Sequence, residues 1–417
     1  MPDLHELHWH ARAIFSDALS ASDPRPKVNE ALSHLSIASP IYSIAIGKAA
    51  TSMALGLDDV LGDKLTAGII VSTSHHHSTR WQSFIGGHPL PNEASLASAR
   101  ATFELLDRAN NERATVIFLI SGGGSAMSEW PISDDISLDD LRSATHGLVS
   151  CGARISEINS VRRAFSAVKG GGLARRAPNT QMFTLIVSDT NPGDEASVAS
   201  GPTLNPPADA PNALEVVEHY HLDKVLPASI MKAVRTRHSP EPVTGTSQVL
   251  LDNKTTLDAA AQKARELGYT STIMDHIREQ PIEEGCELLL ESMRDGCTIS
   301  GGEFSCPVRG DGRGGRNLET TLRCAINLNT NSHVVTLSAG TDGIDGNSPA
   351  AGAIADETTI QRARNLNLDA EQYLARSDSY SFFEQLNDVI VTGPTGTNVR
   401  DLRIVLRSCF KDPSNPC

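Results

Sequence analysis

The chain has few cysteines, and their spacing matches no metal or disulfide pattern. Its 417 residues include seven cysteines, an odd number, and no two of them stand in a CxxC arrangement. Structural zinc sites use such close pairs, and disulfide frameworks use many cysteines in a short secreted chain. The sequence therefore predicts reduced thiols in a cytoplasmic protein without structural zinc.

Basic residues are outnumbered, because 36 lysines and arginines face 50 aspartates and glutamates and the formal net charge is −14. Nucleic acids and anionic membranes attract basic surfaces, so neither is an expected partner. The chain also lacks an apolar run long enough to span a bilayer. Its first residues, MPDLHELHWHARAIF, lack the basic start and the apolar core of a secretory signal. An acidic protein of this kind needs a local cluster of lysine and arginine to hold an anionic substrate.

Segments with the pattern of buried strands alternate with segments of helical periodicity along the chain. Ile41–Ile46, Thr115–Ile120 and Met182–Val187 are short runs rich in apolar and β-branched residues, which are typical of buried strands. The alternation predicts an α/β fold with a Rossmann-like, doubly wound and mostly parallel sheet. Strands and helices alternate again in the second half, so a second α/β domain is expected.

The length of the chain exceeds that of one typical core, which favours two or three domains. The stretch 236–247, TRHSPEPVTGTS, is rich in proline, serine, threonine and glycine and predicts a linker. We therefore expect an N-terminal domain over residues 1–238 and a C-terminal domain over residues 239–417. No sequence feature fixes the oligomeric state, which leaves a homo-oligomer open.

The three predicted strands all end in residues that suit ligand binding. Lys48 follows a glycine after the first strand, SGGGS follows the second, and Asp189 follows the third. Doubly wound sheets bind ligands beyond the carboxyl ends of their strands. Lysine can neutralise a phosphate or a carboxylate, and consecutive glycines can present several N–H groups to one anion. A solvated lysine and a tight turn without a ligand are the alternatives. The candidate anion loop consists of Ser121, Gly122, Gly123 and Gly124.

The densest cluster of glycine and arginine lies between Ile299 and Leu322, ISGGEFSCPVRGDGRGGRNLETTL. It contains no P-loop, which requires GxxxxGK[ST], but GDGRGG has the spacing of a dinucleotide-binding turn and precedes a helix-like run. A glycine-rich hairpin with solvated arginines is the alternative. Arginine can grip a carboxylate or phosphate with two parallel hydrogen bonds. The predicted phosphate-binding residues are Gly312, Gly314, Gly315, Arg316 and Asn317.

Acidic residues stand near the candidate loops. Asp189 and Asp194 lie in SDTNPGDEASVASGPT, and Asp342 and Asp345 lie in TDGIDG. Hydrated Mg²⁺ prefers carboxylate oxygens, and a carboxylate can also orient a hydroxyl nucleophile. Turn formation by the aspartate side chain is the alternative at each position. Anion loops, a cation and a carboxylate together indicate phosphoryl transfer.

A basic stripe is expected on a helix predicted over residues 158–176, which the triple glycine ends or breaks. Arg162 and Lys169 are seven residues apart and would share one helical face. Such a stripe can bind an anionic substrate or simply face water. Three consecutive histidines, His75–His77, point in different directions on a strand or loop. They predict a surface loop rather than a metal site.

These segments, in this order, resemble those of the MOFRL-family glycerate 2-kinases, which have also been labelled hydroxypyruvate reductases. The resemblance runs from IGKAA at Ile46 to TGPTGTNVRDL at Leu402 and includes GGHPLPNEASLASA, LISGGGSAM, INSVRRAFSAVKGGGLA, IVSDTNPGDEASVASGPT and SAGTDGIDG. It implies an ATP- and Mg²⁺-dependent kinase that phosphorylates the 2-hydroxyl of glycerate in the cleft between two α/β domains. It also implies active-site roles for Lys48 and Arg316.

The resulting hypothesis gives every candidate residue a role. The glycine loops and Asn317 bind ATP. The catalytic residues are Lys48, Arg316 and Asp189. The residues that bind the acceptor are Arg162, Lys169 and Asp345. The carboxylates that hold Mg²⁺ are Asp189, Asp194 and Asp342.

The chain departs from the family pattern at Ala164, Gly172, Leu318 and Pro349. Gly172 stands where the resemblance implies arginine, and Leu318 where it implies glutamine. These departures leave open a kinase of a different short sugar acid. Another alternative, an NAD(P)-dependent hydroxypyruvate reductase, predicts a dinucleotide fingerprint directly after the first strand. The turn there, IGKAA, has one glycine, which disfavours the reductase.

Overall fold

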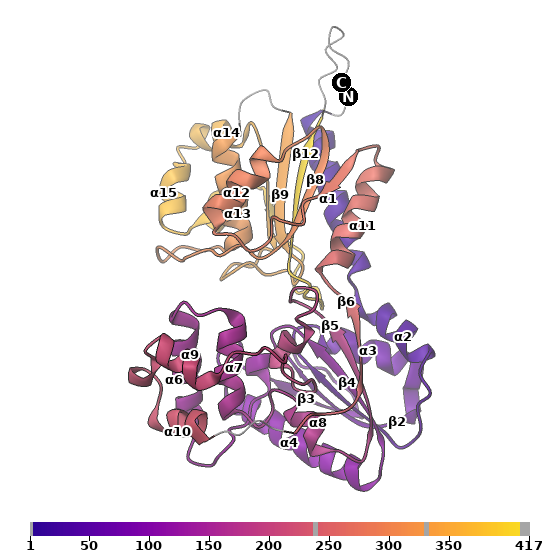
Figure 1. The fold of residues 1–417 in the computed structure, drawn as a ribbon. Helices are drawn as coiled ribbons and strands as arrows, with labels where there is room; N and C mark the ends of the chain where they lie inside the picture. Colours follow the sequence, from indigo (N-terminus) through magenta and orange to yellow (C-terminus); the bar gives the residue numbers. More distant parts are fainter. Residues whose placement is uncertain (1–2, 237–240, 329–332, 409–417) are drawn as a thin grey trace. The chain divides into compact units, whose positions relative to one another are not determined.

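The computed structural model describes residues 3–236, 241–328 and 333–408. The chain folds into two compact units (Figure 1). The central unit is Pro24–Asp252, and the terminal unit combines the described residues before Pro24 with those from Asn253 onward. Each unit has its own six-stranded sheet with helices, so the expected α/β class is confirmed. None of the helices in these ranges is long and apolar enough to cross a membrane.

These boundaries differ from the expected domains 1–238 and 239–417 at both ends of the first domain. Helix α1 (Leu4–Ala21) contributes to the hydrophobic core of the terminal unit. Strand β6 (Thr246–Leu251) pairs with a strand of the central sheet and extends it. The amphipathic pattern of α1 shows that one face is buried, but it does not show which core that face joins.

The central sheet is entirely parallel. In spatial order its strands are β3 (Trp81–Ile85), β2 (Leu65–Ser72), β1 (Ile41–Ile46), β4 (Thr115–Ser121), β5 (Gln181–Val187) and β6. The helices that cover it are α2 (Pro24–Ser33), α3 (Ala50–Leu61), α4 (Glu93–Asn111) and α8 (Gly172–Arg176). Helices α4 and α8 share one hydrophobic core with the sheet face on which Tyr42 and Phe118 lie. Strands β1 and β4 are buried over their whole length, as expected for strands rich in apolar residues that are covered on both faces.

Four helices of the central unit have a second hydrophobic core of their own (Figure 1). They are α6 (Leu138–Ser150), α7 (Ile155–Phe165), α9 (Ala213–His219) and α10 (Ala228–Thr236). Helix α6 begins at a capping box, in which Ser137 Oγ accepts from the Asp140 N–H and the Asp140 carboxylate accepts from the Ser137 N–H. The remaining short elements are α5 (Gly124–Met127), η1 (Gly62–Lys64), η2 (Glu195–Ser200) and η3 (Leu222–Lys224).

The helix expected over residues 158–176 is broken, as expected, but the break begins at Ser166, before the triple glycine, and separates α7 from α8. Helix α7 stops because the next residue, Ser166, has extended backbone angles and forms a β-bridge with Pro131. A neighbouring segment therefore takes the backbone groups that would continue the helix. The expectation that Arg162 and Lys169 share one helical face is wrong, since Lys169 lies in the loop.

The terminal sheet is mixed, because β7 and β8 are parallel and the other neighbouring strands are antiparallel. In spatial order its strands are β11 (Val389–Ile390), β10 (Gly352–Asp356), β9 (Val334–Gly340), β12 (Asp401–Arg407), β8 (Gly296–Gly302) and β7 (Ser271–Ile273). Helices α1 and α11 (Asn253–Glu266) share a core with Ile354, whereas the next residue, Ala355, belongs to a different core. Successive strand residues point to opposite faces, so both faces of the sheet are covered. The remaining helices are α12 (Ile282–Glu291), α13 (Arg316–Asn327), α14 (Thr359–Asn365), α15 (Ala370–Ala375) and α16 (Ser379–Leu386).

Helix α1 is tied to the terminal sheet by a contact that depends on pH. His8 Nε2 lies 2.7 Å from Asp356 Oδ2. Burial acts to raise the pKa of Asp356, but hydrogen bonds from His8 and Thr358 outweigh it and lower the pKa from 3.8 to about 2. Because the folded pKa is the lower one, this carboxylate contributes stability above about pH 4 that is lost as the pH falls towards 2.

We therefore expect the Asp356→Asn variant to lose less thermal stability on acidification than the wild type does. Differential scanning calorimetry between about pH 5 and about pH 3 measures this, because the window covers the titration of the unfolded carboxyl. An equal fall in melting temperature for both proteins would contradict the role of Asp356.

Candidate active site

The turns that follow β1 and β4 are in direct contact. The Lys48 N–H donates to the Gly122 carbonyl at 2.9 Å. Gly47 has a φ of +121°, and a Cβ there would lie 2.4 Å from the Ser121 carbonyl oxygen, so only glycine lets the turns meet. The lysine side chain packs against Gly123, since a Cβ on that glycine would lie 3.0 Å from Lys48 Cγ. The structure thus places Lys48 beside the predicted glycine loop.

A cavity of about 260 Å³ adjoins this loop. Gly123 and Asp189 follow β4 and β5, so the cavity lies at the carboxyl edge of the sheet, where doubly wound folds bind ligands. Arg162 reaches it from α7, and Lys169 from the loop after α7. The volume is small compared with pockets for drug-sized ligands, which indicates a small molecule. Four predicted site residues line the cavity: Gly123, Arg162, Lys169 and Asp189.

A buried ion pair between Lys169 and Glu129 forms part of the cavity wall. Their side chains are 2% and 6% exposed. The second Glu129 oxygen accepts hydrogen bonds from Ser166 Oγ at 2.5 Å and from the Trp130 N–H at 2.9 Å. Burial lowers the pKa of Lys169, and Glu129 acts in the opposite direction. The charge of Lys169 is therefore compensated by the protein before any ligand binds.

Arg162 is the cation of this cavity that is available to a ligand. No hydrogen bond or ion pair joins its guanidinium to any residue in the described ranges. Burial lowers the pKa of Arg162, and Glu129 partly offsets that effect. A planar guanidinium binds a carboxylate through two parallel hydrogen bonds. The cavity therefore suits a small carboxylic acid.

Of the two predicted aspartates after β5, only Asp189 lines the cavity. Asp194 Oδ1 accepts from Ser197 Oγ at 2.6 Å, which favours the turn-forming alternative. Within the part of the chain that the structure describes, no group of three or more His, Cys, Asp or Glu side chains could hold a metal ion. Magnesium in kinases binds one or two carboxylates together with substrate phosphates. Among the predicted metal ligands in the described residues, Asp189 lies at the cavity and could supply one such carboxylate.

In the terminal unit, the predicted phosphate loop contacts the protein's own chain. The Gly312 N–H donates to the Arg376 carbonyl at 3.1 Å, and the Gly314 N–H donates to Asn347 Oδ1 at 2.8 Å. A Cβ at Gly315 would lie 2.5 Å from an oxygen of the Asp345 carboxylate. The glycines are therefore needed for close packing within the protein. This geometry favours chain packing over a cradle for ATP phosphates.

Asp345 caps helix α13 and is 3% exposed. Its two oxygens accept from the Asn317 N–H at 3.1 Å and the Leu318 N–H at 2.8 Å. Burial raises the pKa of Asp345 to about 7, although these two hydrogen bonds act to lower it. The structure therefore places Asp345 at the start of α13, where it accepts from two backbone N–H groups. Its role as a substrate ligand stays a prediction. Asp342 Oδ1 accepts from the Ile344 N–H at 3.2 Å, so it too forms a turn.

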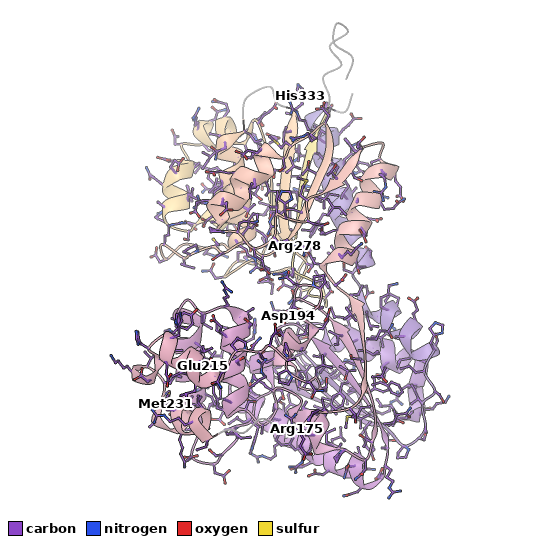
Figure 2. All side chains as sticks on the ribbon, viewed as in Figure 1. Arg175, Asp194, Glu215, Met231, Arg278 and His333 are labelled. Atoms are coloured by element: carbon purple, nitrogen blue, oxygen red, sulfur yellow. The ribbon has the colours of Figure 1, made fainter. Side chains whose placement is uncertain are left out.

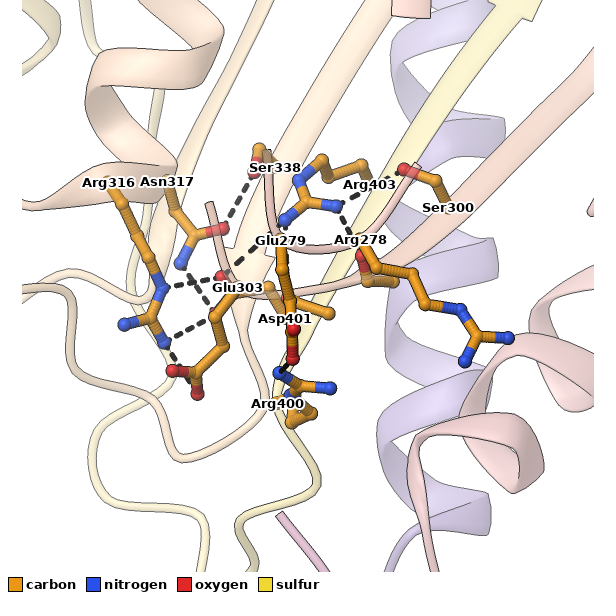
Figure 3. A network of polar contacts seen from close by, with 12 residues as sticks. Arg278, Glu279, Ser300, Glu303, Arg316, Asn317, Ser338, Arg400, Asp401 and Arg403 are labelled. Atoms are coloured by element: carbon orange, nitrogen blue, oxygen red, sulfur yellow. Dashed lines mark hydrogen bonds and ion pairs between the residues drawn. The ribbon is translucent and has the colours of Figure 1, made fainter. Parts of the chain in front are cut away.

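Arg316 is the first residue of α13 and is held by two carboxylates (Figure 3). Its Nε and Nη2 donate to Asp401 at 2.6 and 3.1 Å. Nη2 also lies 2.9 Å from Glu303 Oε1. Burial acts to raise the pKa of Asp401, but Arg316 outweighs it and lowers the pKa. The Arg316 side chain is 34% exposed, so part of the guanidinium remains accessible.

Asn317 and Arg403 support Asp401 from the protein interior (Figure 3). Asn317 Nδ2 donates to Asp401 at 2.9 Å, and its Oδ1 accepts from Ser338 Oγ at 2.7 Å. Arg403 Nη2 lies 3.9 Å from Asp401 Oδ2, and Arg403 Cζ lies 3.5 Å from the centroid of the Phe304 ring. Asn317 is buried and hydrogen bonded on both amide atoms, so it positions the partner of Arg316. Its contact with a nucleotide stays a prediction.

Comparison with known protein families gives two matches along the chain. Residues 10–235 match a domain of unknown function, DUF4147, and residues 296–401 match the MOFRL family. The chain is 35% identical to the D-glycerate 2-kinase of Thermotoga maritima over 97% of this chain and 100% of that protein. The chain belongs to the MOFRL family of glycerate 2-kinases. The resemblance inferred from the sequence motifs is confirmed.

Two further comparisons with glycerate kinases support this assignment to the family. The chain is 30% identical to the glycerate 2-kinase of Pyrococcus horikoshii, with 94% of this chain and 96% of that protein covered. The crystal structure of the Thermotoga maritima glycerate kinase matches with a TM-score of 0.84 and 32% identity, covering 97% of this chain and 100% of that one.

Two departures from the glycerate 2-kinase pattern have a structural basis in this chain. A Cβ at Gly172 would lie 2.1 Å from the Ala167 carbonyl oxygen. Arginine would therefore require the backbone to move. Leu318 is fully buried in the core beneath α13, where an apolar side chain is favoured. Nothing in the structure explains Pro349, which is exposed.

Proposed function

We propose that this protein transfers the γ-phosphoryl group of ATP to the 2-hydroxyl of glycerate, giving 2-phosphoglycerate and ADP. The small cavity of the central unit is the observation that supports this most directly. It joins Arg162 and Asp189 beside Gly123, against which the Lys48 side chain packs. The relatives named glycerate 2-kinase support the choice of glycerate as acceptor.

In this proposal Arg162 binds the glycerate carboxylate and so orients the 2-hydroxyl. Asp189 accepts the hydroxyl proton as the oxygen attacks the γ-phosphorus and the bond to the β-phosphate oxygen breaks. Lys48 acts on the phosphate oxygens, whose charge it stabilises, and the family resemblance implies a like role for Arg316. Mg²⁺ would be held by the ATP phosphates and by Asp189 and would neutralise phosphate charge.

The decisive experiment is phosphorus NMR of the product formed from Mg-ATP and D-glycerate. We expect 2-phosphoglycerate and ADP in equal amounts, and loss of turnover in the Lys48→Ala variant. The Lys64→Ala variant is the matched control, because Lys64 is an exposed lysine of the same unit. Formation of 3-phosphoglycerate, or full activity of Lys48→Ala, would overturn the proposed position or the proposed role.

Two alternatives are separated by changing the substrate. Turnover of another short hydroxy acid, with none of glycerate, would favour a kinase of a different acceptor. Oxidation of NADH or NADPH by hydroxypyruvate would favour the reductase. The single glycine in the turn after β1 argues against the reductase, because a dinucleotide fingerprint needs three in that place.

A further inference from the structure

A second cavity of the central unit, of about 750 Å³, has no role in the proposed kinase reaction. Arg162 and Arg163 are neighbours on α7, but Arg162 lines the small cavity and Arg163 lines this one. Its other walls come from α10 and from the proline-rich loop after η2. The two cavities are therefore separate sites with separate cations.

Two arginines of this second cavity meet at Gly170. A Cβ on Gly170 would lie 2.8 Å from Arg163 Cδ, and Arg175 Nη2 donates to the Gly170 carbonyl at 2.6 Å. Arg175, labelled in Figure 2, belongs to α8. Arg163 also donates to Ser160 Oγ at 2.8 Å. These neutral partners hold both guanidinium groups in place without neutralising their charge.

The charge of this cavity is one-sided. Three arginines are among its described lining residues, and no aspartate or glutamate is. Burial lowers the pKa of Arg163, with Asp194 acting in the opposite direction, and burial also lowers the pKa of Arg175. Asp194 is already bonded to Ser197. Desolvated guanidinium groups of this kind gain from an anion that can accept several hydrogen bonds.

Much of the rest of the wall is apolar, although Ser160, Asn205 and Asn212 also line it. Besides the arginines, the cavity is lined by the rings of Pro206, Pro207, Pro211 and Pro242 and by Leu214 and Val234. The volume is much larger than one phosphate needs and falls in the range of pockets for organic ligands. An anion bound here would therefore carry a carbon skeleton.

We propose that this cavity binds an organic phosphate, with the phosphate on Arg163 and Arg175 and the carbon part against the proline wall. Guanidinium and phosphate groups match in geometry, and a phosphate dianion balances two arginines. The inference does not rest on the proposed kinase reaction, because it concerns a cavity with its own cations.

Titration calorimetry tests this with inorganic phosphate, an adenine nucleotide and a sugar phosphate as probes. We expect Arg175→Ala to weaken binding of at least one organic phosphate by about tenfold or more, since one of two charged partners is lost. Arg176→Ala is the matched control, because Arg176 is the next residue along the chain but is exposed and paired with Asp107. We expect the control to bind as the wild type does. The affinity of Arg175→Lys should lie between those of the wild type and Arg175→Ala, because lysine keeps the charge but lacks the planar guanidinium.

The probes also identify the ligand. A loss confined to the nucleotide points to a base-bearing ligand, and a loss for the sugar phosphate as well points to phosphate esters in general. Equal affinities for wild type and Arg175→Ala, equal losses in Arg175→Ala and Arg176→Ala, or binding of inorganic phosphate only would overturn the inference. Melting temperatures show whether each variant is folded. Turnover of D-glycerate is measured separately, so failure here leaves the kinase proposal standing.

Discussion

The Arg316→Ala variant is expected to phosphorylate D-glycerate at least about a thousandfold more slowly than the wild type. An arginine that stabilises a transferring phosphoryl group contributes a factor of this size in other phosphoryl-transfer enzymes. The Arg316 guanidinium is fixed by Asp401 and Glu303 and still has an accessible face. A group held in this way loses little freedom when charge develops in the transition state. Steady-state rates of ADP release measure the effect.

Stability must be measured beside the rate, because Arg316 also neutralises a buried carboxylate. Its removal leaves Asp401 with Asn317 and the more distant Arg403. Loss of one partner of a buried pair costs about 3–5 kcal/mol, and the remaining cation reduces that cost. Arg316→Lys keeps the charge and should stay folded, yet it lacks the fork and should remain slow. Near-normal rates in both variants would remove Arg316 from the mechanism.

Arg313→Ala is the matched control from the same loop. Its guanidinium stacks on the Tyr380 ring at 4.4 Å from the centroid. Removal of this partly exposed contact should change activity little. A loss of turnover as large as that of Arg316→Ala would mean that the shape of the loop, and not the Arg316 side chain, controls the rate.

The sequence predicted the central site better than the terminal one, and the reason lies in the strands. Short runs rich in apolar and β-branched residues predicted β1, β4 and β5, and a parallel sheet brings the ends of such strands to one edge. Lys48, Gly123 and Asp189 could therefore be grouped from the sequence. Glu129 could not, because the segment SAMSEWP carries no motif. Its contact with Lys169 depends on a loop that was expected to be a helix.

In the terminal unit, glycine spacing was ambiguous. A glycine permits close approach of a ligand or of the protein's own chain, and the spacing GxGxxG is the same in both cases. At Gly312 and Gly315 the approaching group is the chain itself. The network around Asp401 had a fainter signal in the sequence DLRIVLR, where charged residues interrupt an apolar strand. Charged residues are seldom fully buried without partners.

The Glu129→Ala variant is expected to be about 3–5 kcal/mol less stable than the wild type. It leaves the Lys169 ammonium buried without its carboxylate and deprives Ser166 of an acceptor. The folded pKa of Lys169 would then fall further below 10.5. Stability of the variant should rise as the pH increases from the folded towards the unfolded pKa, because only the unfolded state then keeps the proton. Chemical denaturation at several pH values measures this.

An exposed pair provides the comparison. Lys232 and Asp135 lie 2.8 Å apart with side chains 67% and 43% exposed. Asp135→Ala should cost at most about 1 kcal/mol, since solvent already screens this pair. Equal costs for Asp135→Ala and Glu129→Ala would show that burial of the Glu129 pair has little energetic weight.

The double variant Glu129→Gln/Lys169→Met separates the structural role of the pair from its role in binding. Glutamine can still accept from Ser166, and methionine fills the space of the lysine without a charge. Replacing both ions of a buried pair is often neutral or stabilising, so stability should return to within about 1 kcal/mol of wild type. If the pair only shapes the cavity wall, the KM of the double variant for D-glycerate should equal that of the wild type. If the Lys169 charge helps to bind D-glycerate, the double variant should be as stable as the wild type but have a higher KM.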